Sequence, residues 1–215
     1  MRAVRSVAGC FLKSGYEYPD EEAGLTRALW PVVVPLIPPL PCQVLEIGCG
    51  NGAFAAELVR LGYLVTGLDA SHSGITIAKQ REPRASFHCR NIFDPTPEEW
   101  VGQFDVVVSL ETIEHLSLPG ALLQRSREAL RPGGTLIIST PYHGYLKNLV
   151  LALTGGMDRH FTALWDHGHV KFFSKKTLGD LLRRGGFEGI RFLGCGRLPW
   201  LWKSIVAVAA KPGLG

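Results

Sequence analysis

The sequence has few cysteines, and their spacing does not indicate a disulfide framework or a zinc site. Its five cysteines are scattered along 215 residues, and no two of them form a C-x-x-C pair. An odd number without metal-type spacing is typical of reduced thiols, because disulfides are rare in the reducing cytoplasm. We therefore expect free thiols and a cytoplasmic protein.

Long apolar runs are also lacking. A membrane-spanning helix needs about 20 consecutive apolar residues. The most apolar segments, residues 30–40 and 146–153, are far shorter, and prolines interrupt the first of them. Arg2 and Arg5 precede a weakly apolar stretch, but Lys13 ends it too early for a signal-peptide core. We expect neither a transmembrane helix nor secretion.

The composition is that of one globular domain. A hydrophobic content of 46% suffices for a buried core, and the length suits one large domain or one domain with an inserted lobe. The net charge of +4 is uneven, with −3 on residues 1–142 and +7 on residues 143–215. A solvated basic face, an acidic substrate, an anionic membrane surface and RNA all remain open as explanations.

From residue 41 to 215 the sequence alternates between apolar runs of strand length and segments of helix length. Strands separated by such helices favour parallel pairing with right-handed crossovers. We therefore predict an α/β domain with a doubly wound, mostly parallel, seven-stranded sheet. The expected strands are 44–47, 64–68, 85–89, 104–110, 135–139, 190–193 and 205–209, and the expected helices are 53–61, 72–81, 121–130 and 175–184.

Two regions depart from this alternation. Residues 1–40 form an N-terminal extension, in which residues 20–34 have the pattern of a helix with Asp20 as its N-cap. Residues 141–173 form an insertion after the fifth strand, with an apolar stretch of helix length at 145–153 and then a loop rich in His, Asp and aromatic residues. Long irregular segments in such domains often cover an active site, so we predict a lid.

A glycine-rich loop follows the first expected strand, within the segment VLEIGCGNG at residues 44–52. Glycines there let the backbone turn tightly and approach a ligand. Asp69 ends the second strand, 19 residues after Gly50, where a carboxylate can accept hydrogen bonds from both hydroxyls of a ribose. Together these features indicate a cofactor that contains adenosine. The loop alone does not discriminate, because Gly48-x-Gly50-x-x-Ala53 also satisfies the loose dinucleotide fingerprint.

From about residue 43 to 209 the sequence resembles class I S-adenosylmethionine-dependent methyltransferases, which have a Rossmann-like fold. Residues 44–52 resemble the first motif of that family, which implies that Glu46 lies beside the methionine part of the cofactor. Several further motifs agree in order along the chain. The cofactor-binding residues implied by the resemblance are Glu46, Gly48, Cys49, Gly50, Gly52, Asp69 with Ala70 and Ser71 on the ribose, Asn91 and Ile92 on the adenine, and Leu110 and Glu111.

The segment Glu111-Thr112-Ile113-Glu114-His115 directly follows the strand at 104–110, at the sheet edge where doubly wound folds bind ligands. Two carboxylates and an imidazole, joined by His169 from the insertion, form a donor set suited to Mg²⁺ or Zn²⁺. A bound ion would stabilise the alkoxide of a methyl acceptor. Two alternatives stay open: His115 acts as a general base without metal, or these residues have no catalytic role.

The same segment resembles ubiquinone-pathway O-methyltransferases and small-RNA 2′-O-methyltransferases, in which such residues and a later His hold a divalent ion. That resemblance implies a metal site of Glu111, Glu114, His115 and His169, with Glu114 and His115 as catalytic residues. His167 competes with His169 for the last place. The RNA enzymes have a second His directly after the first, whereas Leu116 stands here, which counts against RNA.

The apolar stretch at 145–153 resembles the insertion of the quinone enzymes. It would cover a hydrophobic acceptor, touch a membrane surface peripherally, or only pack on its own domain. We predict a methyltransferase that methylates a hydroxyl of a small, partly apolar molecule, with S-adenosyl-L-methionine as cofactor and nucleic acid disfavoured as acceptor. The alternatives are an RNA 2′-O-methyltransferase and a cofactor-binding module without catalysis.

Overall fold

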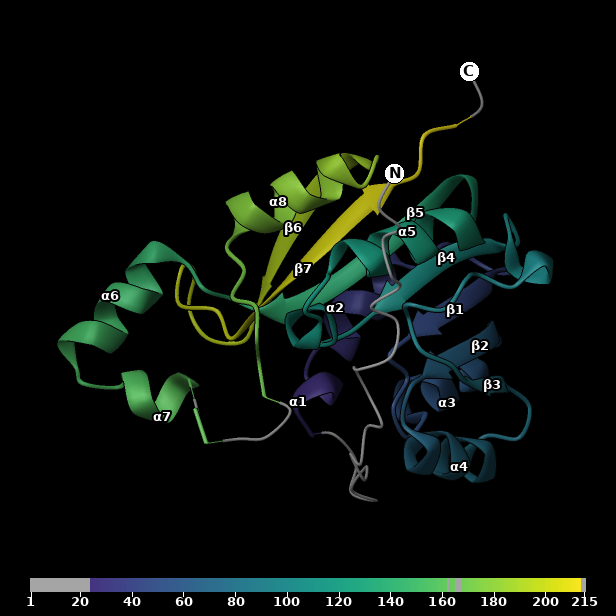
Figure 1. The fold of residues 1–215 in the computed structure, drawn as a ribbon, viewed down its shortest axis with the longest axis horizontal. Coiled ribbons are helices and arrows are strands. Elements are labelled where there is room, and N and C mark those ends of the chain that lie inside the picture. Colours follow the sequence, from purple (N-terminus) through teal and green to yellow (C-terminus); the bar gives the residue numbers. More distant parts are fainter. Residues whose placement is uncertain (1–23, 162, 165–167, 214–215) are drawn as a thin grey trace, which may run out of the picture.

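A seven-stranded β-sheet runs through the middle of the molecule in the computed structural model, which describes residues 24–161, 163–164 and 168–213 (Figure 1). The strand order is β3-β2-β1-β4-β5-β7-β6, and β7 runs antiparallel to both of its neighbours. This confirms the predicted doubly wound, mostly parallel sheet. The strands are β1 Gln43–Ile47, β2 Leu64–Asp69, β3 Ser86–Cys89, β4 Phe104–Ser109, β5 Leu130–Pro141, β6 Glu188–Cys195 and β7 Ser204–Ala210.

The centre of the sheet is buried on both faces. Every residue of β4 is buried, and its β-branched sequence FDVVVS suits a strand packed on both sides. Strand order reverses between β1 and β4, which are direct neighbours although β2 and β3 separate them in sequence. In such folds ligands bind beyond the carboxyl ends of the strands at this reversal.

Helices cover both faces of the sheet. Leu123 of α5 and Leu178 of α8 belong to the apolar cluster on one face, and Phe54 of α3 and Ile75 of α4 belong to the cluster on the other. Side-chain caps begin two of these helices: Ser71 accepts a hydrogen bond from the Gly74 amide, and Ser174 forms a capping box with Thr177. The helices are α3 Ala53–Arg60, α4 His72–Arg81, α5 Gly120–Ala129 and α8 Lys175–Arg184.

The helix predicted for residues 20–34 is wrong as a single element. The described part of this segment forms two short helices, α1 Gly24–Arg27 and α2 Trp30–Val33, followed by a 3-10 turn. Pro31 explains the break, because it lacks an amide hydrogen and its ring crowds the carbonyl four residues earlier, so it fits only the first turn of a new helix. The predicted N-cap, Asp20, lies outside the described residues.

The fifth strand is longer than predicted. Strand β5 begins at Leu130 rather than residue 135, and its pairing with β4 shifts register between Phe104 and Val106. Residues 132–134, which lie between the predicted helix at 121–130 and the predicted strand at 135–139, therefore form an irregularity inside β5. Gly133, with a φ of 75°, donates its amide to the carbonyl of Lys211 beyond β7, which holds this irregularity against the sheet.

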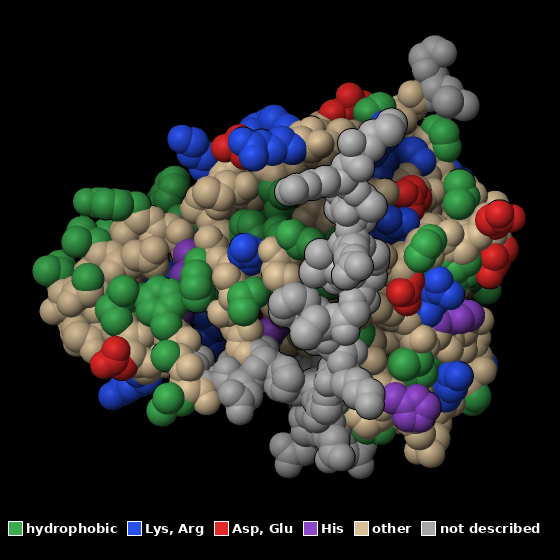
Figure 2. All heavy atoms as spheres, viewed as in Figure 1, with side chains coloured by type: hydrophobic (Ala, Val, Ile, Leu, Met, Phe, Trp, Pro, Cys, Tyr) green, Lys and Arg blue, Asp and Glu red, His purple; other side chains and the backbone are tan. Residues whose placement is uncertain are grey.

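The insertion between β5 and α8 contains α6 Tyr145–Leu153 and α7 Met157–Phe161, which stand away from the sheet at one end of the molecule (Figure 1). Helix α6 matches the predicted apolar helix. It leaves large apolar side chains in solvent, with Tyr145 84% and Leu153 78% exposed. Figure 2 shows hydrophobic side chains gathered over this end of the surface. In the described ranges, no helix has both the length and the apolar character needed to cross a membrane.

Candidate functional site

The loop between β1 and α3 takes a backbone shape that explains its glycines. Gly48, Gly50 and Gly52 have φ values of 78°, 50° and 73°, in the left-handed region that residues with a Cβ rarely adopt. The amides of Gly48 and Cys49 both donate to the carbonyl of Leu68, at 2.8 and 3.1 Å. These two hydrogen bonds fix the loop to the carboxyl end of β2. Burial raises the pKa of the Cys49 thiol well above its usual value.

Asp69, at the end of β2, ties two loops together. One carboxylate oxygen accepts the Gly50 amide at 2.9 Å, and the other accepts the Ser71 amide at 2.8 Å. Burial raises the pKa of Asp69, while the amides of Ser71, Gly50 and Ala70 lower it. The carboxylate therefore lies between the glycine loop and the turn that begins α4, which is the place predicted for ribose recognition.

Glu46 is buried in β1 beneath the glycine loop. The Ala55 backbone hydrogen-bonds to its carboxyl group, but among the described residues its Oε2 atom has no partner. Burial raises the pKa of Glu46 well above its usual value, and the charge of Asp69 adds to this. A buried acceptor oxygen without a donor fits S-adenosylmethionine, whose ammonium and sulfonium are positive and whose ribose offers hydroxyls.

Asn91 and Ile92 follow β3 and, with Leu45, Ile47 and Trp100, line a small recess that is open to solvent. Ile92 is buried. The Asn91 side-chain oxygen accepts the Phe93 amide at 3.0 Å and so shapes its own turn. Asn91 thus stands beside an apolar recess at the same edge of the sheet as Asp69, while its carboxamide oxygen already has a donor.

The loop after β4 touches the glycine loop directly. Gly48 lies so close to Thr112 that an added Cβ would overlap the Thr112 hydroxyl oxygen and lie 2.7 Å from its methyl carbon. The Thr112 hydroxyl donates to the carbonyl of the buried Leu110 at 3.0 Å. The glycine loop, predicted to bind the cofactor, and the loop after β4, predicted to face the acceptor, are therefore in direct contact.

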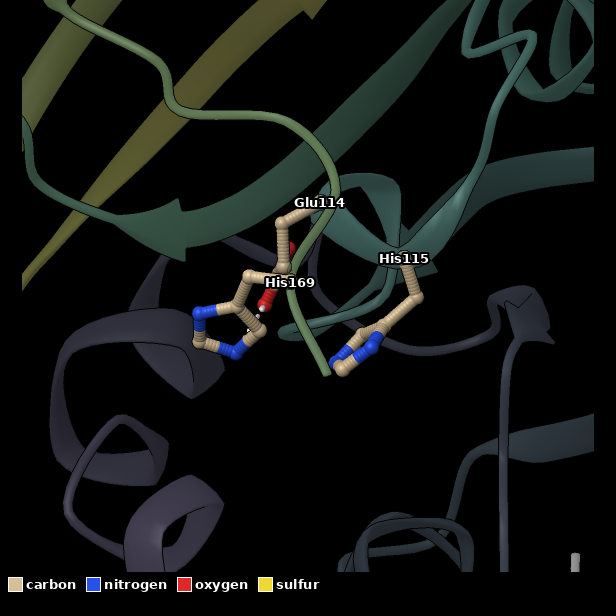
Figure 3. A group of neighbouring side chains, drawn as sticks. All are labelled: Glu114, His115 and His169. Carbon is tan, nitrogen blue, oxygen red and sulfur yellow. Dashed lines mark ion pairs between the residues drawn. The ribbon is translucent and has the colours of Figure 1, made fainter. Parts of the chain in front are cut away.

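Three predicted ligand residues lie together beyond this contact. Glu114 and His115 belong to a 3-10 turn at Ile113–His115, and His169 lies near the end of the insertion. The amides of Val170 and Lys171 both donate to the Glu114 carbonyl at 2.9 Å, which fixes the end of the insertion against the turn. Figure 3 shows the three side chains directed into one space. One ligand atom from each lies within 4.8 Å of the others.

The electrostatics of this group suit a cation. Glu114 is fully buried, and among the described residues neither of its carboxylate oxygens has a well-aligned donor. Burial, and then the charge of Glu111, raise its pKa well above the usual value. Burial and the neighbouring His115 and His160 lower the pKa of His169 to about 4, so its imidazole is neutral, the form that binds metals. A buried carboxylate with imidazoles fits Zn²⁺ or a similar divalent ion.

Glu111, the fourth predicted ligand, is turned elsewhere. Its φ of 47° is unusual for a residue with a side chain, and its oxygens accept the hydroxyls of Ser139 at 2.8 Å and Ser204 at 3.1 Å. Burial raises the pKa of Glu111 to about 7, although both hydroxyls lower it. The structure groups Glu114, His115 and His169, and it directs Glu111 toward β5 and β7. The competing His167 lies outside the described residues.

Sequence reasoning missed Ser139, Ser204 and Lys147 at this site. The two serines stand near the carboxyl end of β5 and at the start of β7, each directly next to an isoleucine of an apolar run, a signal that could have found them. Lys147 is the buried residue of α6, and no pattern in an apolar helix of this length predicts which way its lysine turns.

Comparison with known proteins gives independent evidence for the family of this chain. The sequence model of a protein family described as "Methyltransferase domain" matches residues 22–191. A ubiquinone biosynthesis O-methyltransferase of Cereibacter sphaeroides is 32% identical over 175 residues, which cover 76% of this chain and 69% of that protein.

Solved structures share the fold. A methyltransferase of Methanosarcina mazei, described as S-adenosylmethionine-dependent, has a TM-score of 0.66 and 22% identity, with 85% of this chain and 98% of that chain covered. Magnesium protoporphyrin IX methyltransferase of Synechocystis PCC 6803, solved with bound S-adenosylhomocysteine, has a TM-score of 0.62 and 20% identity, with 86% and 80% covered.

The contact between Gly48 and Thr112 predicts a specific cost for Gly48→Ala. The left-handed φ alone costs on the order of 1 kcal/mol, and the overlap with Thr112 adds at least as much again. The control is Gly102→Ala, since Gly102 has a φ of 69° but no described atom within 4 Å of an added Cβ. Chemical denaturation should show a larger loss in the free energy of unfolding for Gly48→Ala than for Gly102→Ala. Adding Thr112→Ala to Gly48→Ala should restore part of that loss. Equal losses in the two single variants would contradict the contact.

Proposed function

The chain belongs to the S-adenosylmethionine-dependent methyltransferases, and on that premise we propose that it methylates a hydroxyl group of a small, partly apolar molecule. The observation that carries the proposal is the group Glu114, His115 and His169, which adjoins the glycine loop through Thr112. The curated relative of Cereibacter sphaeroides, named as an O-methyltransferase of ubiquinone biosynthesis, supports the same chemistry.

In this proposal the residues at the ends of β1, β2 and β3 hold the cofactor. S-adenosylmethionine, when bound, supplies an electrophilic methyl group on a sulfonium. The acid pair Glu46 and Asp69 faces its positive charge, and the remaining lone pairs of Asp69 accept the ribose hydroxyls. Asn91 and Ile92 border the recess for the adenine. The protein contributes mainly position, since the displacement needs the acceptor oxygen in line with the methyl group.

The acceptor side must bind the hydroxyl and remove its proton. The acceptor oxygen forms a bond to the methyl carbon, the sulfur keeps the electron pair of the broken bond, and one proton leaves the oxygen. We propose that Glu114, His115 and His169 hold a divalent ion, which lowers the pKa of a hydroxyl when it is bound. With the ion bound, the proton leaves the hydroxyl to water, because the lone pair of His115 is then committed to the ion. Without an ion, His115, half-buried beside His169, would be the base that receives the proton.

The insertion supports an apolar acceptor. Helices α6 and α7 expose several large apolar side chains at the end of the molecule that the insertion forms (Figure 2). As a lid, this lobe would cover an apolar acceptor, and the same side chains would contact a membrane surface from which such an acceptor is drawn. Leu116 stands where the RNA enzymes carry a second His, so RNA is not the acceptor in this proposal.

Replacing Asp69 tests the cofactor site. Asp69→Ala removes the acceptor for the Gly50 and Ser71 amides and for the ribose, so we expect S-adenosylhomocysteine to bind at least about tenfold more weakly in calorimetry. The control is Asp180→Ala, which removes an exposed carboxylate that pairs with Arg183 on α8 and should leave affinity unchanged. Undiminished binding by Asp69→Ala would refute the site.

Transfer of a labelled methyl group identifies the acceptor class. With radiolabelled S-adenosylmethionine we expect label in hydroxylated small molecules, such as catechols with apolar substituents, as an acid-stable methyl ether. Label in an RNA pool instead would favour the polyanion acceptor suggested by the basic C-terminal third. Tight cofactor binding with no label in either pool would identify a module without catalysis.

The ion-binding group is tested by removing its ligands. Glu114→Gln and His169→Ala should each weaken Zn²⁺ or Co²⁺ binding by at least about tenfold, and exhaustive chelation should abolish methyl transfer. Glu99→Gln, which removes an exposed carboxylate from the 3-10 turn Glu98–Trp100, is the matched control. Full activity in chelator would remove the ion from the proposal and leave His115 as a base without metal.

A further inference from the structure

Helix α6 buries its lysine and exposes its apolar side chains, the reverse of the usual arrangement. Lys147 is only 5% exposed, whereas Tyr145 and Leu153 on the same helix lie mostly in solvent. The Lys147 ammonium donates to the carbonyl of Tyr142 at 2.7 Å. An ammonium has three donors, and within the described chain Lys147 has no carboxylate partner within ion-pair distance. A buried cation in this state is costly unless something else pairs with it.

The charges around Lys147 are mainly positive. Burial and then the neighbouring Arg197 lower the pKa of Lys147 to about 8. Arg197 lies on the loop between β6 and β7 and also lowers the pKa of His160. The acid that acts on Lys147 is Glu111, whose two oxygens already accept the hydroxyls of Ser139 and Ser204. Among the described residues, Lys147 and Arg197 are therefore left without a carboxylate of their own.

Two imidazoles lie close to Lys147: His143 directly follows Tyr142, whose carbonyl accepts from Lys147, and the His160 ring packs next to the His143 ring. His143 is 8% exposed with no partner for Nδ1, and His160 has no partner for Nε2, among the described residues. Their ring centroids are 5.3 Å apart, and Phe161 and Phe172 pack against His143 at 5.6 and 5.0 Å. Burial lowers the pKa of His143 to about 4, so this ring is neutral and offers one N–H. This cluster thus combines imidazole nitrogens that lack partners among the described residues with aromatic rings packed against them.

This cluster adjoins the group proposed to hold the acceptor hydroxyl. The segment from His169 to Phe173 joins the two places, because His169 belongs to the ion-binding group, the Phe172 ring packs against His143, and the Phe173 carbonyl accepts the His143 amide at 2.9 Å. A small molecule whose hydroxyl lies at Glu114, His115 and His169 would therefore place another of its groups near Lys147.

We propose that Lys147, with Arg197 and the imidazoles of His143 and His160, binds an anionic oxygen group of the methyl acceptor, a carboxylate or a phosphate. The charged donors recognise the negative group, and the aromatic rings hold the apolar frame of the molecule. This inference rests on the proposed function, because it assigns a property to the acceptor of that reaction.

The experiment compares an acid with its neutral ester. In the presence of S-adenosylhomocysteine, wild-type protein should bind 3,4-dihydroxybenzoate at least about tenfold more tightly than its methyl ester, measured by calorimetry. Lys147→Met should lower the affinity for the acid to that for the ester and leave the ester unchanged, whereas Lys147→Arg should keep the preference. Lys176→Met, which removes an exposed cation of α8, should change neither affinity.

A second variant guards against a folding artefact. Lys147→Met removes a buried charge, so its thermal unfolding midpoint should stay equal or rise. Arg197→Gln changes an exposed side chain and should weaken binding of the acid severalfold without changing that of the ester.

Inhibition by benzoate but not by inorganic phosphate would assign the anionic group as a carboxylate, and the reverse would assign it as a phosphate.

Two results would overturn the inference: equal affinity of the wild-type protein for acid and ester, or a preference for the acid that survives in Lys147→Met. Preference for the acid with no methyl transfer to it or to any other hydroxyl would keep the anion site and reject the proposed function. Methyl transfer to the ester as efficient as to the acid, with no acid preference in binding, would keep the function and reject the anion site.

Discussion

Burial of the central strands on both faces is the constraint on which the rest of the molecule depends. Because β4 and its neighbours are covered by helices, side chains in mid-strand can only build the core. The polar side chains of the site therefore gather at the carboxyl ends of the parallel strands and in the loops that follow them. The glycine loop after β1, Asp69 after β2, Asn91 after β3 and the turn after β4 therefore meet along one edge, although they are distant in the sequence.

Close packing at that edge brings the glycine loop into contact with the turn that is proposed to bind the acceptor. Gly48 has no side chain, so Thr112 can approach the cofactor loop, and the turn that carries Glu114 and His115 follows immediately. The end of the insertion is held there by two hydrogen bonds to the Glu114 carbonyl. A shift of any of these three segments would move the other two, which makes the contact with Gly48 central to how the acceptor meets the methyl group.

The site holds polar groups that folding alone would not favour. Glu46 and Glu114 are buried with oxygens that lack donors among the described residues, and Lys147 is buried without a carboxylate partner. Each of these groups costs stability when it is left unpaired. Natural proteins keep such groups mainly where a ligand completes them. Their gathering at one edge of the sheet is physical support for three adjoining binding places, for cofactor, ion and acceptor.

The sequence by itself determined what depends on neighbours along the chain. The alternation of strands and helices and the tight glycine turn at positions 48 to 52 are set by local periodicity and backbone freedom, and the structure agrees with them. Only the tertiary structure decided the rest: that Glu111 turns to Ser204, 93 residues away, that α6 buries Lys147, and that β5 starts at Leu130. Such features depend on sheet register and on packing between distant segments, for which a single sequence carries no local pattern.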